Sequence, residues 1–321
     1  MKRIKIGILM GGPSSEHEVS LNSGESVFIA LDRKKFIPTR LIISKDWKLT
    51  ADDRELKFPA GLKRYDVIFI ALHGVFGEDG VVQTILDSLD IPYTGSGAVA
   101  SWLGMDKWFS AELFKKAGIS VPKSYLIRSR TDLPGIRLPF VLKPRRGGSS
   151  VGVEIVKARK EIKRKSRQAF KHENELIGQE YVKGKEFTCG IVERNGRPRV
   201  LPVVEIRPKK NYEFFDYEAK YITGASEEIV PAPVSKRLTQ EIQTAALRAH
   251  RAIGCSSYSR SDFIVRNGTP YILEINTLPG LTENSLIPKS SRAGGIPFPE
   301  LLETIVASAF YDFRKKSTTS R

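Results

Sequence analysis

The fold of this chain is decided by the stretch RSDFIVRNGTPYILEINTLPG, which spans residues 260–280. Two apolar runs in it, Asp262–Val265 and Tyr271–Ile275, have the length and composition of strands. Between them lies the dipeptide Asn267-Gly268, which is a strong signal for a tight turn. The stretch therefore predicts an antiparallel β-hairpin.

Three polar side chains interrupt this apolar hairpin. Side chains in a strand alternate between two faces, so Glu274 and Asn276 point the same way. Acids among apolar neighbours are costly unless they are paired or bind a metal. A surface hairpin with scattered polar residues is the alternative, and it fits the apolar flanks less well. Asp262, Glu274 and Asn276 therefore predict a set of oxygen ligands for Mg²⁺.

This metal site depends on the register of the hairpin. A two-residue turn would place Asp262 opposite Leu273, and Glu274 would then point away from Asp262. A three-residue loop, Asn267–Thr269, places Asp262 opposite Glu274 instead. We therefore predict an odd-length loop, or a β-bulge, despite the local signal for a tight turn. Both carboxylates should share one face, near a metal pair separated by roughly 3.5–4 Å.

The N-terminal part of the chain alternates strand and helix patterns. Strands are expected at Lys5–Met10, Pro38–Ser44 and Asp66–Leu72, with helices at Leu21–Leu31 and Asp79–Leu89. Ser20 is a candidate N-cap for the first helix. This alternation predicts a parallel, doubly wound α/β sheet, which ends at the turn-rich stretch 92–97.

The rest of the chain has a mixed α+β pattern. We expect one helix over Ala98–Ala117 and another over Thr239–Ile253, with strands at Phe140–Lys143, Val153–Val156, Phe187–Val192 and Val200–Ile206. A small α+β unit should end near Glu180. The predicted organisation is three modules, at residues 1–97, 98–180 and 181–321, and the last carries most of the chemistry.

Composition excludes several classes of protein. No apolar run is long enough to cross a bilayer, so we expect no membrane partner. Two cysteines among 321 residues exclude a disulfide scaffold, and a reducing cytoplasm fits that count. The net charge of +16 leaves nucleic-acid binding open. Much of that charge lies in Lys157–Lys171, where apolar residues recur at helical spacing, so we favour a solvated helix face over a polyanion site.

Two further stretches have the composition of ligand-binding loops. Gly147–Gly152 is rich in glycine and serine, and backbone N–H groups of such loops bind phosphate oxygens. Lys107 and Lys143 are candidate phosphate ligands, although a lone lysine is usually a solvated surface group. Gly11–Gly24 runs from a strand into a helix, where backbone N–H groups attract anions.

Glu16 and His73 are candidate substrate ligands. Glu16 could hold an ammonium group, or it could merely complement the dipole of the following helix. His73 follows a buried strand, at the end where doubly wound sheets place ligands, although a lone histidine is more often structural.

The chain resembles the D-alanine–D-alanine ligases in nine blocks that follow that family's order over nearly the whole sequence. These blocks are GGPSSEHEVSLNSG (11–24), ALHGVFGEDG (71–80), PYTGSG (92–97), MDK (105–107), KPRRGGSSVG (143–152), KEFT (185–188), FDYEAKY (215–221), RSDF (260–263) and LEINTLPGLTENSLIP (273–288). The resemblance implies an ATP-grasp fold, with an N-terminal doubly wound parallel-sheet domain and two α+β units between which ATP lies.

The resemblance also implies a role for each matching residue. The implied ATP ligands are Lys107, Lys143, Ser149, Ser150, Glu180, Tyr181, Val182, Glu186 and Lys220, and the implied ligands of two Mg²⁺ or Mn²⁺ ions are Asp262, Glu274 and Asn276. The implied substrate and catalytic residues are Glu16, His73, Ser149, Tyr221, Arg260, Gly280, Ser285 and Leu286. Among them, Glu16 would hold the ammonium of the first D-alanine, and Ser285 with Leu286 would form the pocket of the second.

The resemblance implies that the carboxylate of the first D-alanine is converted to an acyl phosphate, which the amine of the second D-alanine attacks. Arg260 and the Gly280 N–H would stabilise the tetrahedral oxyanion of that second step. A closing loop that carries Lys220 and Tyr221 would keep water out. Departures from the family pattern occur at Tyr181-Val182, at Leu278 and at Glu283-Asn284, so they affect the adenine site and the second-substrate pocket.

Two D-alanines and ATP are the expected ligands, a homodimer is the expected assembly, and no nucleic acid is expected. The alternatives are a D-alanine–D-lactate or D-alanine–D-serine ligase of the same fold, which Tyr221 disfavours, and a catalytically dead protein that binds polyanions. The second alternative is disfavoured because a protein without catalytic activity would be expected to have lost metal ligands, whereas Asp262, Glu274 and Asn276 are all present.

Overall fold

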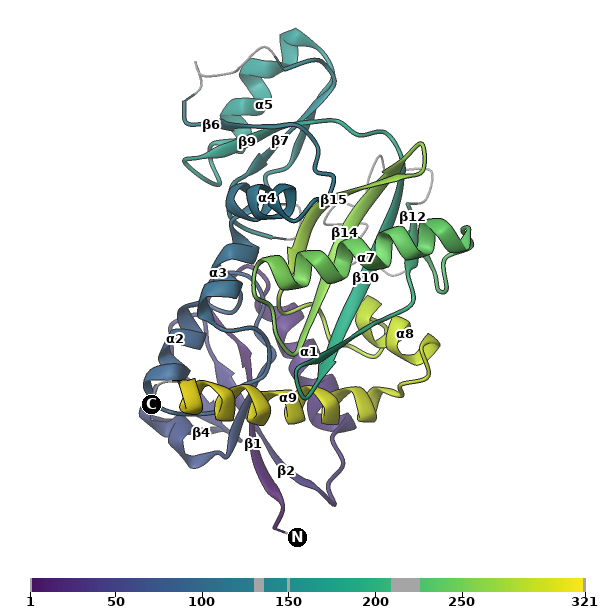
Figure 1. Ribbon diagram of the computed structural model, residues 1–321. Coiled ribbons are helices and arrows are strands. Elements are labelled where there is room, and N and C mark those ends of the chain that lie inside the picture. Colours follow the sequence, from purple (N-terminus) through teal and green to yellow (C-terminus); the bar gives the residue numbers. More distant parts are fainter. Residues whose placement is uncertain (1, 130–135, 149–150, 209–225, 320–321) are drawn as a thin grey trace.

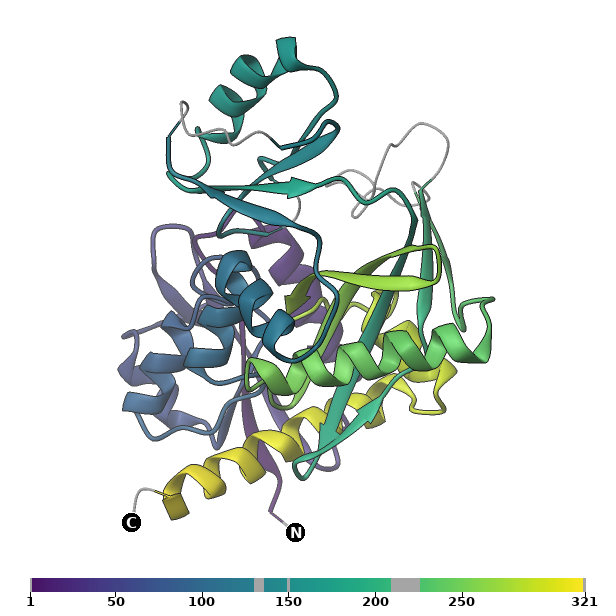
Figure 2. The ribbon, with the colours of Figure 1, turned by 45° about the horizontal axis from the view of Figure 1, so that its top comes forward.

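The chain contains three β-sheets arranged along the molecule (Figure 1). The computed structural model describes residues 2–129, 136–148, 151–208 and 226–319. A small sheet forms the top of the molecule in Figure 1 and in Figure 2, and the N-terminal sheet lies towards the other end. The third and largest sheet lies between them. One α/β sheet is thus combined with two further sheets that carry helices, which is the predicted α/β and α+β organisation.

The N-terminal sheet has the strand order β4-β3-β2-β1-β5. Its centre is parallel, as predicted, and consists of β1 (Ile4–Gly11), β2 (Phe36–Ile43) and β5 (Val67–Ile70). An antiparallel edge of two short strands, β3 (Leu49–Ala51) and β4 (Arg54–Leu56), was not predicted. Between and after these strands come α1 (His17–Ala30), the 3-10 helix η1 (Ala60–Arg64) and α2 (Val81–Ser88).

The prediction that Ser20 caps the first helix is wrong. Helix α1 begins at His17, so Ser20 lies inside it and is fully buried. Its hydroxyl donates to the Ala71 carbonyl at 2.8 Å and accepts from the Gly11 N–H at 2.8 Å. Ser20 therefore ties α1 to the ends of β1 and β5, and a tertiary contact has replaced the cap that the local sequence suggested.

The single helix predicted over Ala98–Ala117 is two helices, α3 (Ala98–Met105) and α4 (Lys107–Lys116). Asp106 breaks the helix because its backbone is extended, with φ −85° and ψ 95°. Its carboxylate accepts the N–H groups of Trp108 and Phe109 at 3.2 and 3.1 Å, as an N-cap does.

The small sheet has the order β6-β9-β7-β8, and β9, its last strand along the chain, ends at Glu180. Its strands are β6 (Ser124–Ile127), β7 (Phe140–Pro144), β8 (Glu154–Val156) and β9 (Leu176–Glu180). The basic stretch forms the 3-10 helix η2 (Arg159–Glu161) and helix α5 (Ile162–Ala169), of which only Ser166 and Ala169 are buried. The predicted helix is confirmed, and the choice between a solvated face and a polyanion site stays a prediction.

The large sheet is antiparallel and has the order β13-β12-β10-β14-β15, with β11 added beside β10. Its strands are β10 (Lys185–Arg194), β11 (Arg197–Val200), β12 (Val204–Pro208), β13 (Ser226–Ile229), β14 (Tyr258–Arg266) and β15 (Thr269–Asn276). The single strand predicted over Val200–Ile206 is wrong, because the chain leaves β11 at Val200 and resumes as β12 at Val204. Pro202, which lacks an N–H, lies in the gap. Helix α7 (Lys236–Ala252) packs on this sheet.

The β14–β15 hairpin combines a tight turn with a bulge. Asn267 and Gly268 have positive φ values of 51° and 79°, and Arg266 pairs with Thr269, so the predicted three-residue loop is wrong. The register then shifts between Asp262 and Phe263, so that Asp262 pairs with Glu274. The predicted alternative, a β-bulge, is therefore confirmed, and the two carboxylates lie opposite each other.

The chain ends with helices α8 (Leu286–Ala293) and α9 (Phe298–Thr319). Apolar side chains of α9, including Leu301 and Ile305, share one core with Ile8 and Phe69 of the N-terminal sheet. The C-terminal helix therefore packs on the N-terminal sheet. The predicted division into modules at residues 97 and 180 stays a prediction. No helix among the described residues is long and apolar enough to cross a membrane.

Candidate active site

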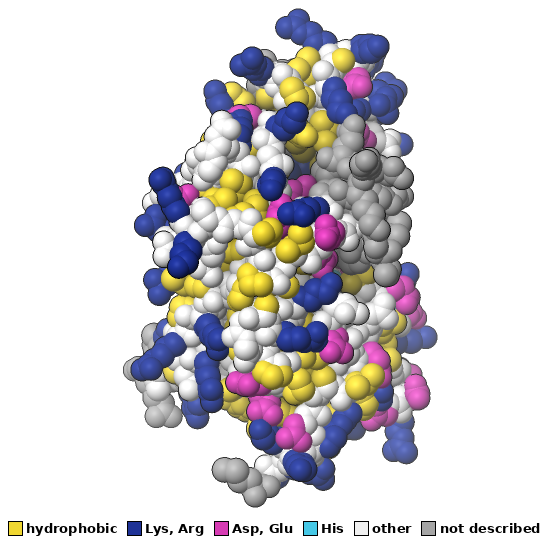
Figure 3. Space-filling view, turned by 90° about the vertical axis from the view of Figure 1, so that its right-hand side faces the viewer, with side chains coloured by type: hydrophobic (Ala, Val, Ile, Leu, Met, Phe, Trp, Pro, Cys, Tyr) yellow, Lys and Arg dark blue, Asp and Glu magenta, His cyan; other side chains and the backbone are white. Residues whose placement is uncertain are grey.

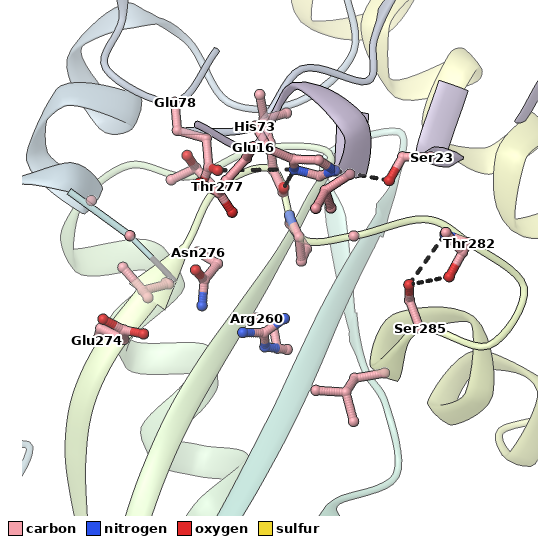
Figure 4. Close-up of a pocket in the computed structure, with 18 of the residues that line it drawn as sticks. Glu16, Ser23, His73, Glu78, Arg260, Glu274, Asn276, Thr277, Thr282 and Ser285 are labelled. Carbon is pink, nitrogen blue, oxygen red and sulfur yellow. Dashed lines mark hydrogen bonds and ion pairs between the residues drawn. The ribbon is translucent and has the colours of Figure 1, made fainter. Parts of the chain in front are cut away.

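One pocket collects polar residues from all parts of the chain (Figure 4). It lies where the loops after β1 and β5 meet the end of the β14–β15 hairpin. The predicted site residues that line it are Glu16, His73, Lys107, Arg260, Glu274, Asn276, Gly280, Ser285 and Leu286. The structure therefore brings together residues that are separated by more than two hundred positions in the sequence.

Asp262 is held by three neighbours at the bulged end of the hairpin. The Arg260 guanidinium donates to both of its carboxylate oxygens at 2.8 Å. The Asn276 amide donates to Oδ2 at 3.2 Å, and the Thr188 hydroxyl donates to Oδ1 at 2.7 Å. Sequence reasoning did not single out Thr188, which lies across from Asp262 on β10. Two forked charge-assisted bonds fix the orientation of Arg260 towards the pocket.

Lys107 links the predicted phosphate loop to the hairpin. Its ammonium donates to the Gly147 carbonyl and lies 3.8 Å from Glu274 Oε2. Lys107 is the first residue of α4, and its own N–H donates to the Arg145 carbonyl at 3.0 Å. The ammonium is therefore held between a loop that could bind phosphates and a carboxylate that could bind a metal.

A buried ion pair that the sequence reasoning missed anchors this arrangement. Asp106 is fully buried, and both of its oxygens accept from Arg145 Nε, at 3.0 and 2.8 Å. Arg145 also donates to Glu175 at 2.6 Å. Because Asp106 caps α4 while Arg145 begins the loop 145–148, the pair fixes Lys107 beside that loop. Asp106 lies in the MDK block and Arg145 in the KPRRGGSSVG block, but no sequence pattern joined the two.

Glu16 reaches across the pocket from the start of α1. It is 8% exposed and stands at the N-cap position of α1, where its side chain makes no capping hydrogen bond. The choice between a substrate ligand and a partner of the helix dipole stays a prediction. A Cβ added to Gly74 would lie 2.7 Å from Glu16 Oε2, and one added to Gly148 would lie 3.5 Å from it. The carboxylate thus extends over Gly74 towards the phosphate loop.

His73 is buried beside Glu16 and is held by two hydrogen bonds. Its Nδ1 lies 3.1 Å from the Leu278 carbonyl, and its Nε2 lies 2.8 Å from the Ser23 hydroxyl. Burial lowers the pKa of His73, so the ring is neutral at pH 7. A carbonyl can only accept, so Nδ1 carries the proton and Nε2 accepts from Ser23.

Leu278, a departure from the family pattern, fits against the PYTGSG block. Its side chain is buried, and a Cβ on Gly95 would lie 2.5 Å from its Cδ2. Gly95, with φ 91°, therefore provides both the turn and the space that Leu278 needs.

The opposite side of the pocket is built by the loop before α8 (Figure 4). The Ser285 hydroxyl lies 2.7 Å from that of Thr282 and accepts the Thr282 N–H at 3.2 Å. Ser285 is the N-cap residue of α8, so the free N–H groups of that helix begin at Leu286. Lys289 and Glu228, which sequence reasoning missed, also line the pocket and pair at 2.7 Å. Glu283 is exposed and pairs with Arg292.

The other predicted nucleotide residues lie outside this pocket. Lys143 is buried on β7, and Glu186 lies on β10. Glu180 ends β9, where its carboxylate accepts from Arg266 at 2.8 Å, and Tyr181 and the buried Val182 follow it. Lys143 and Glu180 therefore belong to the small sheet, and Glu186 belongs to the large sheet. The remaining predictions, Ser149, Ser150, Lys220 and Tyr221, fall outside the described residues.

Within the described ranges, no three side chains of the types His, Cys, Asp and Glu gather to hold a metal. The predicted set comprises two carboxylates and one amide, Asp262, Glu274 and Asn276, which share the bulged end of the hairpin. Oxygen donors of this kind suit Mg²⁺ or Mn²⁺ rather than zinc.

The chain is similar to known proteins over nearly its whole length. A family model described as D-ala D-ala ligase C-terminus matches residues 113–307, and one described as D-ala D-ala ligase N-terminus matches residues 5–61 and 48–96. A D-alanine–D-alanine ligase of Fervidobacterium nodosum is 39% identical over 320 residues, which cover 95% of this chain and 98% of that protein.

Two solved structures have the same fold. The D-alanine–D-alanine ligase from Bacillus anthracis, complexed with ATP, has a TM-score of 0.83 and 34% identity, and the match covers 98% of this chain and 100% of that one. The VanG D-Ala:D-Ser ligase from Enterococcus faecalis also has a TM-score of 0.83, with 29% identity over 96% of this chain and 100% of that one.

Proposed function

The chain belongs to the D-alanine–D-alanine ligase family, and from that premise we propose how its own residues carry out the reaction. The enzyme uses ATP to join two D-alanines into D-alanyl-D-alanine for peptidoglycan synthesis, and it releases ADP. The roles of individual residues, the metal, the assembly and the location in the cell are the proposal.

We assign the nucleotide to the space between the small and large sheets. Lys143 on β7 and Lys107 on α4 would neutralise the phosphates, and Glu180, Tyr181, Val182 and Glu186 would line the nucleoside part. This assignment is supported by the position of Lys107, which already holds the Gly147 carbonyl of the glycine-rich loop. Ser149, Ser150 and Lys220 would complete the phosphate site.

We assign two Mg²⁺ or Mn²⁺ ions to Asp262, Glu274 and Asn276. The donor set fits, because the bulge places two carboxylates opposite each other and the Asn276 amide reaches Asp262. When bound, the ions would offset the negative charge of the ATP phosphates and hold them in position. Arg260 and Lys107 already place positive charge beside the two carboxylates.

In the first step, Glu16 would hold the ammonium of the first D-alanine and direct its carboxylate towards ATP. A carboxylate oxygen attacks the γ-phosphorus, the bond to the β–γ bridging oxygen breaks, and ADP leaves. The product is an acyl phosphate, whose carbonyl carbon is a much better electrophile than that of a carboxylate. The position of Glu16 between Gly74 and Gly148 supports this role.

In the second step, the amine of the second D-alanine attacks that carbonyl carbon. Arg260 and the Gly280 N–H would stabilise the oxyanion of the tetrahedral adduct. The adduct then expels inorganic phosphate, and the nitrogen gives up a proton. Ser285 and the N–H of Leu286, at the start of α8, would bind the carboxylate of the second D-alanine. Tyr221 would close the site over Glu16 and Ser149.

The observation that carries this proposal is the bulge that sets Asp262 opposite Glu274 beside Arg260. The experiment measures ADP release with D-alanine alone and with D-alanine plus D-serine or D-lactate, and identifies each product by mass spectrometry. We expect the dipeptide D-alanyl-D-alanine as the main product in every mixture. A mixed product that dominates would favour a ligase of the D-serine or D-lactate kind instead.

The assembly and the location follow from the resemblance. We propose a homodimer, and the exposed apolar side chains Val99, Trp102 and Phe109 on α3 and α4 are available for such a contact. Sedimentation of the purified protein would test it. We also propose a reducing cytoplasm, because Cys189 and Cys255 are free thiols.

A further inference from the structure

An ion pair that the predicted site does not include joins helix α8 to strand β13 at the pocket. The Lys289 ammonium donates to Glu228 Oε2 at 2.7 Å, and both residues line the pocket, as Ser285 does. Their side chains are 34% and 18% exposed, so the pair is partly shielded from solvent. Its charges therefore act on a molecule that enters the pocket, because water screens them only in part.

Lys289 reaches the pocket because of its place on α8. From Leu286 to Ser291 it is the one residue that is not buried. Its N–H donates to the Ser285 carbonyl at 3.0 Å, so it lies one turn after Ser285. Side chains of a helix lean towards its N-terminus. The Lys289 side chain is therefore directed over the turn that begins at Ser285, which is the turn assigned to the carboxylate of the second D-alanine.

Glu228 is the acid that β13 presents to this part of the pocket. It lies opposite Ile206 of β12, and Ile206 shares a small core with Leu286 at the start of α8. The alternation of side chains along β13 turns Glu227 to the other face, where it lies 3.9 Å from Arg207. The sheet thus places Glu228 beside the first turn of α8, where its carboxylate holds the Lys289 ammonium.

Three cationic side chains line the pocket within the described parts of the chain, Lys107, Arg260 and Lys289. The first two stand beside the proposed metal ligands, at 3.8 Å from Glu274 and 2.8 Å from Asp262. Lys289 is the cation at the α8 end. A substrate carboxylate that leaves water to bind at that end is costly unless a positive charge compensates it. An ammonium carries three N–H donors, so Lys289 can bind a second carboxylate while it holds the first.

We propose that Lys289 is a further ligand for the carboxylate of the second D-alanine, and that Glu228 holds its ammonium at the pocket. The inference rests on the role proposed for Ser285 and Leu286, and it adds a residue that sets the affinity for the second substrate alone. The positive charge of Lys289 attracts the carboxylate, whereas the negative charge of Glu228 repels it. The two partners therefore have opposite effects on the second substrate. A pair that only held the fold together would give effects of one sign, because the loss of either partner breaks it.

Steady-state rates of ADP release by the full chain over a wide range of D-alanine concentrations, at saturating ATP and Mg²⁺, test this inference. Two D-alanines bind in turn, so the rates give two Michaelis constants. Lys289→Met removes the charge and keeps the length of the side chain. We expect it to raise the second Michaelis constant roughly tenfold, as for the loss of a hydrogen bond to a charged group, and to leave the first within about twofold. Lys289→Arg keeps the charge and should stay within about threefold of the wild type in both constants.

Glu228→Gln separates a substrate ligand from a structural ion pair. Its amide oxygen still accepts from Lys289, but the negative charge is gone. We expect the second Michaelis constant to fall about threefold, which is the size of a partly screened charge effect. A second constant that rises or stays the same in this variant overturns the inference, and so does an unchanged second constant in Lys289→Met. Thermal melts of the same preparations show that each variant is folded.

The matched control is Arg292→Met, which removes a positive charge from the same helix. The Arg292 side chain is 53% exposed, pairs with Glu283 at 2.8 Å and is not among the described residues that line the pocket. Both Michaelis constants of this control should stay within about twofold of the wild type. A tenfold rise of its second constant would mean that the net charge of α8, and not a contact of Lys289, sets the affinity, and would overturn the inference.

The outcomes separate this inference from the ligase function. If the wild type forms D-alanyl-D-alanine but Lys289→Met has an unchanged second Michaelis constant, only the inference fails. If the wild type forms no dipeptide from ATP and D-alanine, the ligase function itself fails.

Discussion

At its turn, the β14–β15 hairpin pairs Arg266 with Thr269 across Asn267 and Gly268, whereas at its other end the register shifts by one residue and Asp262 faces Glu274. The turn end follows the local sequence, because Asn-Gly favours the positive φ values observed there. The site end departs from the regular pairing that this turn would impose. A regular ladder would have set Asp262 against Leu273 and turned Glu274 to the opposite face.

The comparison shows that the hairpin keeps the turn that its local sequence favours and changes its register only beside the site. The bulge adds one residue, Leu273, on β15 opposite the junction of Asp262 and Phe263, directly beside the site, and leaves the turn undisturbed. Phe263 and Ile272 keep their places in the core under α7, while Glu274 and Asn276 turn towards the pocket. The turn end should therefore govern stability alone, and the bulged end should govern turnover.

The largest effect is expected from Glu274→Gln at the bulged end. The substitution removes one charge and preserves volume, so the fold should persist while the proposed metal site loses a ligand. We expect ADP release to fall by roughly a thousandfold or more in saturating Mg²⁺. A matched control is Glu283→Gln, which removes an exposed acid on the loop that follows β15 and should leave turnover within about twofold. Near-wild-type turnover of Glu274→Gln would contradict the assignment of Glu274 as a metal ligand.

The next effect is expected from Arg260→Lys. Lysine keeps the positive charge but cannot reproduce the fork that holds both oxygens of Asp262. We expect kcat to fall by about a hundredfold, in the range seen when one oxyanion donor is lost, with little change in melting temperature. Steady-state kinetics and a thermal melt on the same preparation would check this. A large loss of stability without a loss of kcat would place Arg260 in the fold and not in the chemistry.

The opposite pattern is expected from Gly268→Ala at the turn end. No atom lies within 4 Å of the added Cβ, so the cost is the strain of φ 79° for a residue with a side chain. We expect the free energy of unfolding to fall by about 1 kcal/mol and kcat to stay unchanged. Chemical denaturation measures the first and ADP release the second. A fall in kcat would mean that the turn and the bulge are coupled.

The sequence predicted the elements whose patterns are local, and the structure confirms the parallel core, the hairpin and the bulge. The errors arise where a polar side chain serves a distant partner. Ser20 is a residue type typical of an N-cap, but its hydroxyl joins α1 to the ends of two strands. Asp106 was expected inside a helix, but it binds Arg145, 39 positions further along the chain. No spacing rule in one sequence contains such partners.

The site was predictable to the extent that the resemblance named its residues. Glu16, Lys107, Arg260 and Glu274 do meet in one pocket. Glu78 also lines this pocket, and it was missed because an acid near a glycine-rich loop is unremarkable in sequence. The pairing of Lys289 with Glu228 was missed for the same reason, since it joins α8 to β13.

The smallest effect is expected from the basic helix, which lies far from either end of the hairpin. Lys163, Arg164 and Arg167 of α5 are exposed, and Lys and Arg side chains are spread over the whole face in Figure 3 instead of lining one groove. Reversing these three charges to glutamate should therefore leave ligase activity within a few-fold, because exposed charges at this distance are screened at physiological salt. Kinetics at low and at physiological ionic strength would measure it, together with RNA binding by the parent chain. A large loss of activity, or tight salt-sensitive RNA binding that the reversal abolishes, would mean that the charge of +16 serves a polyanion and that the solvated face has a second use.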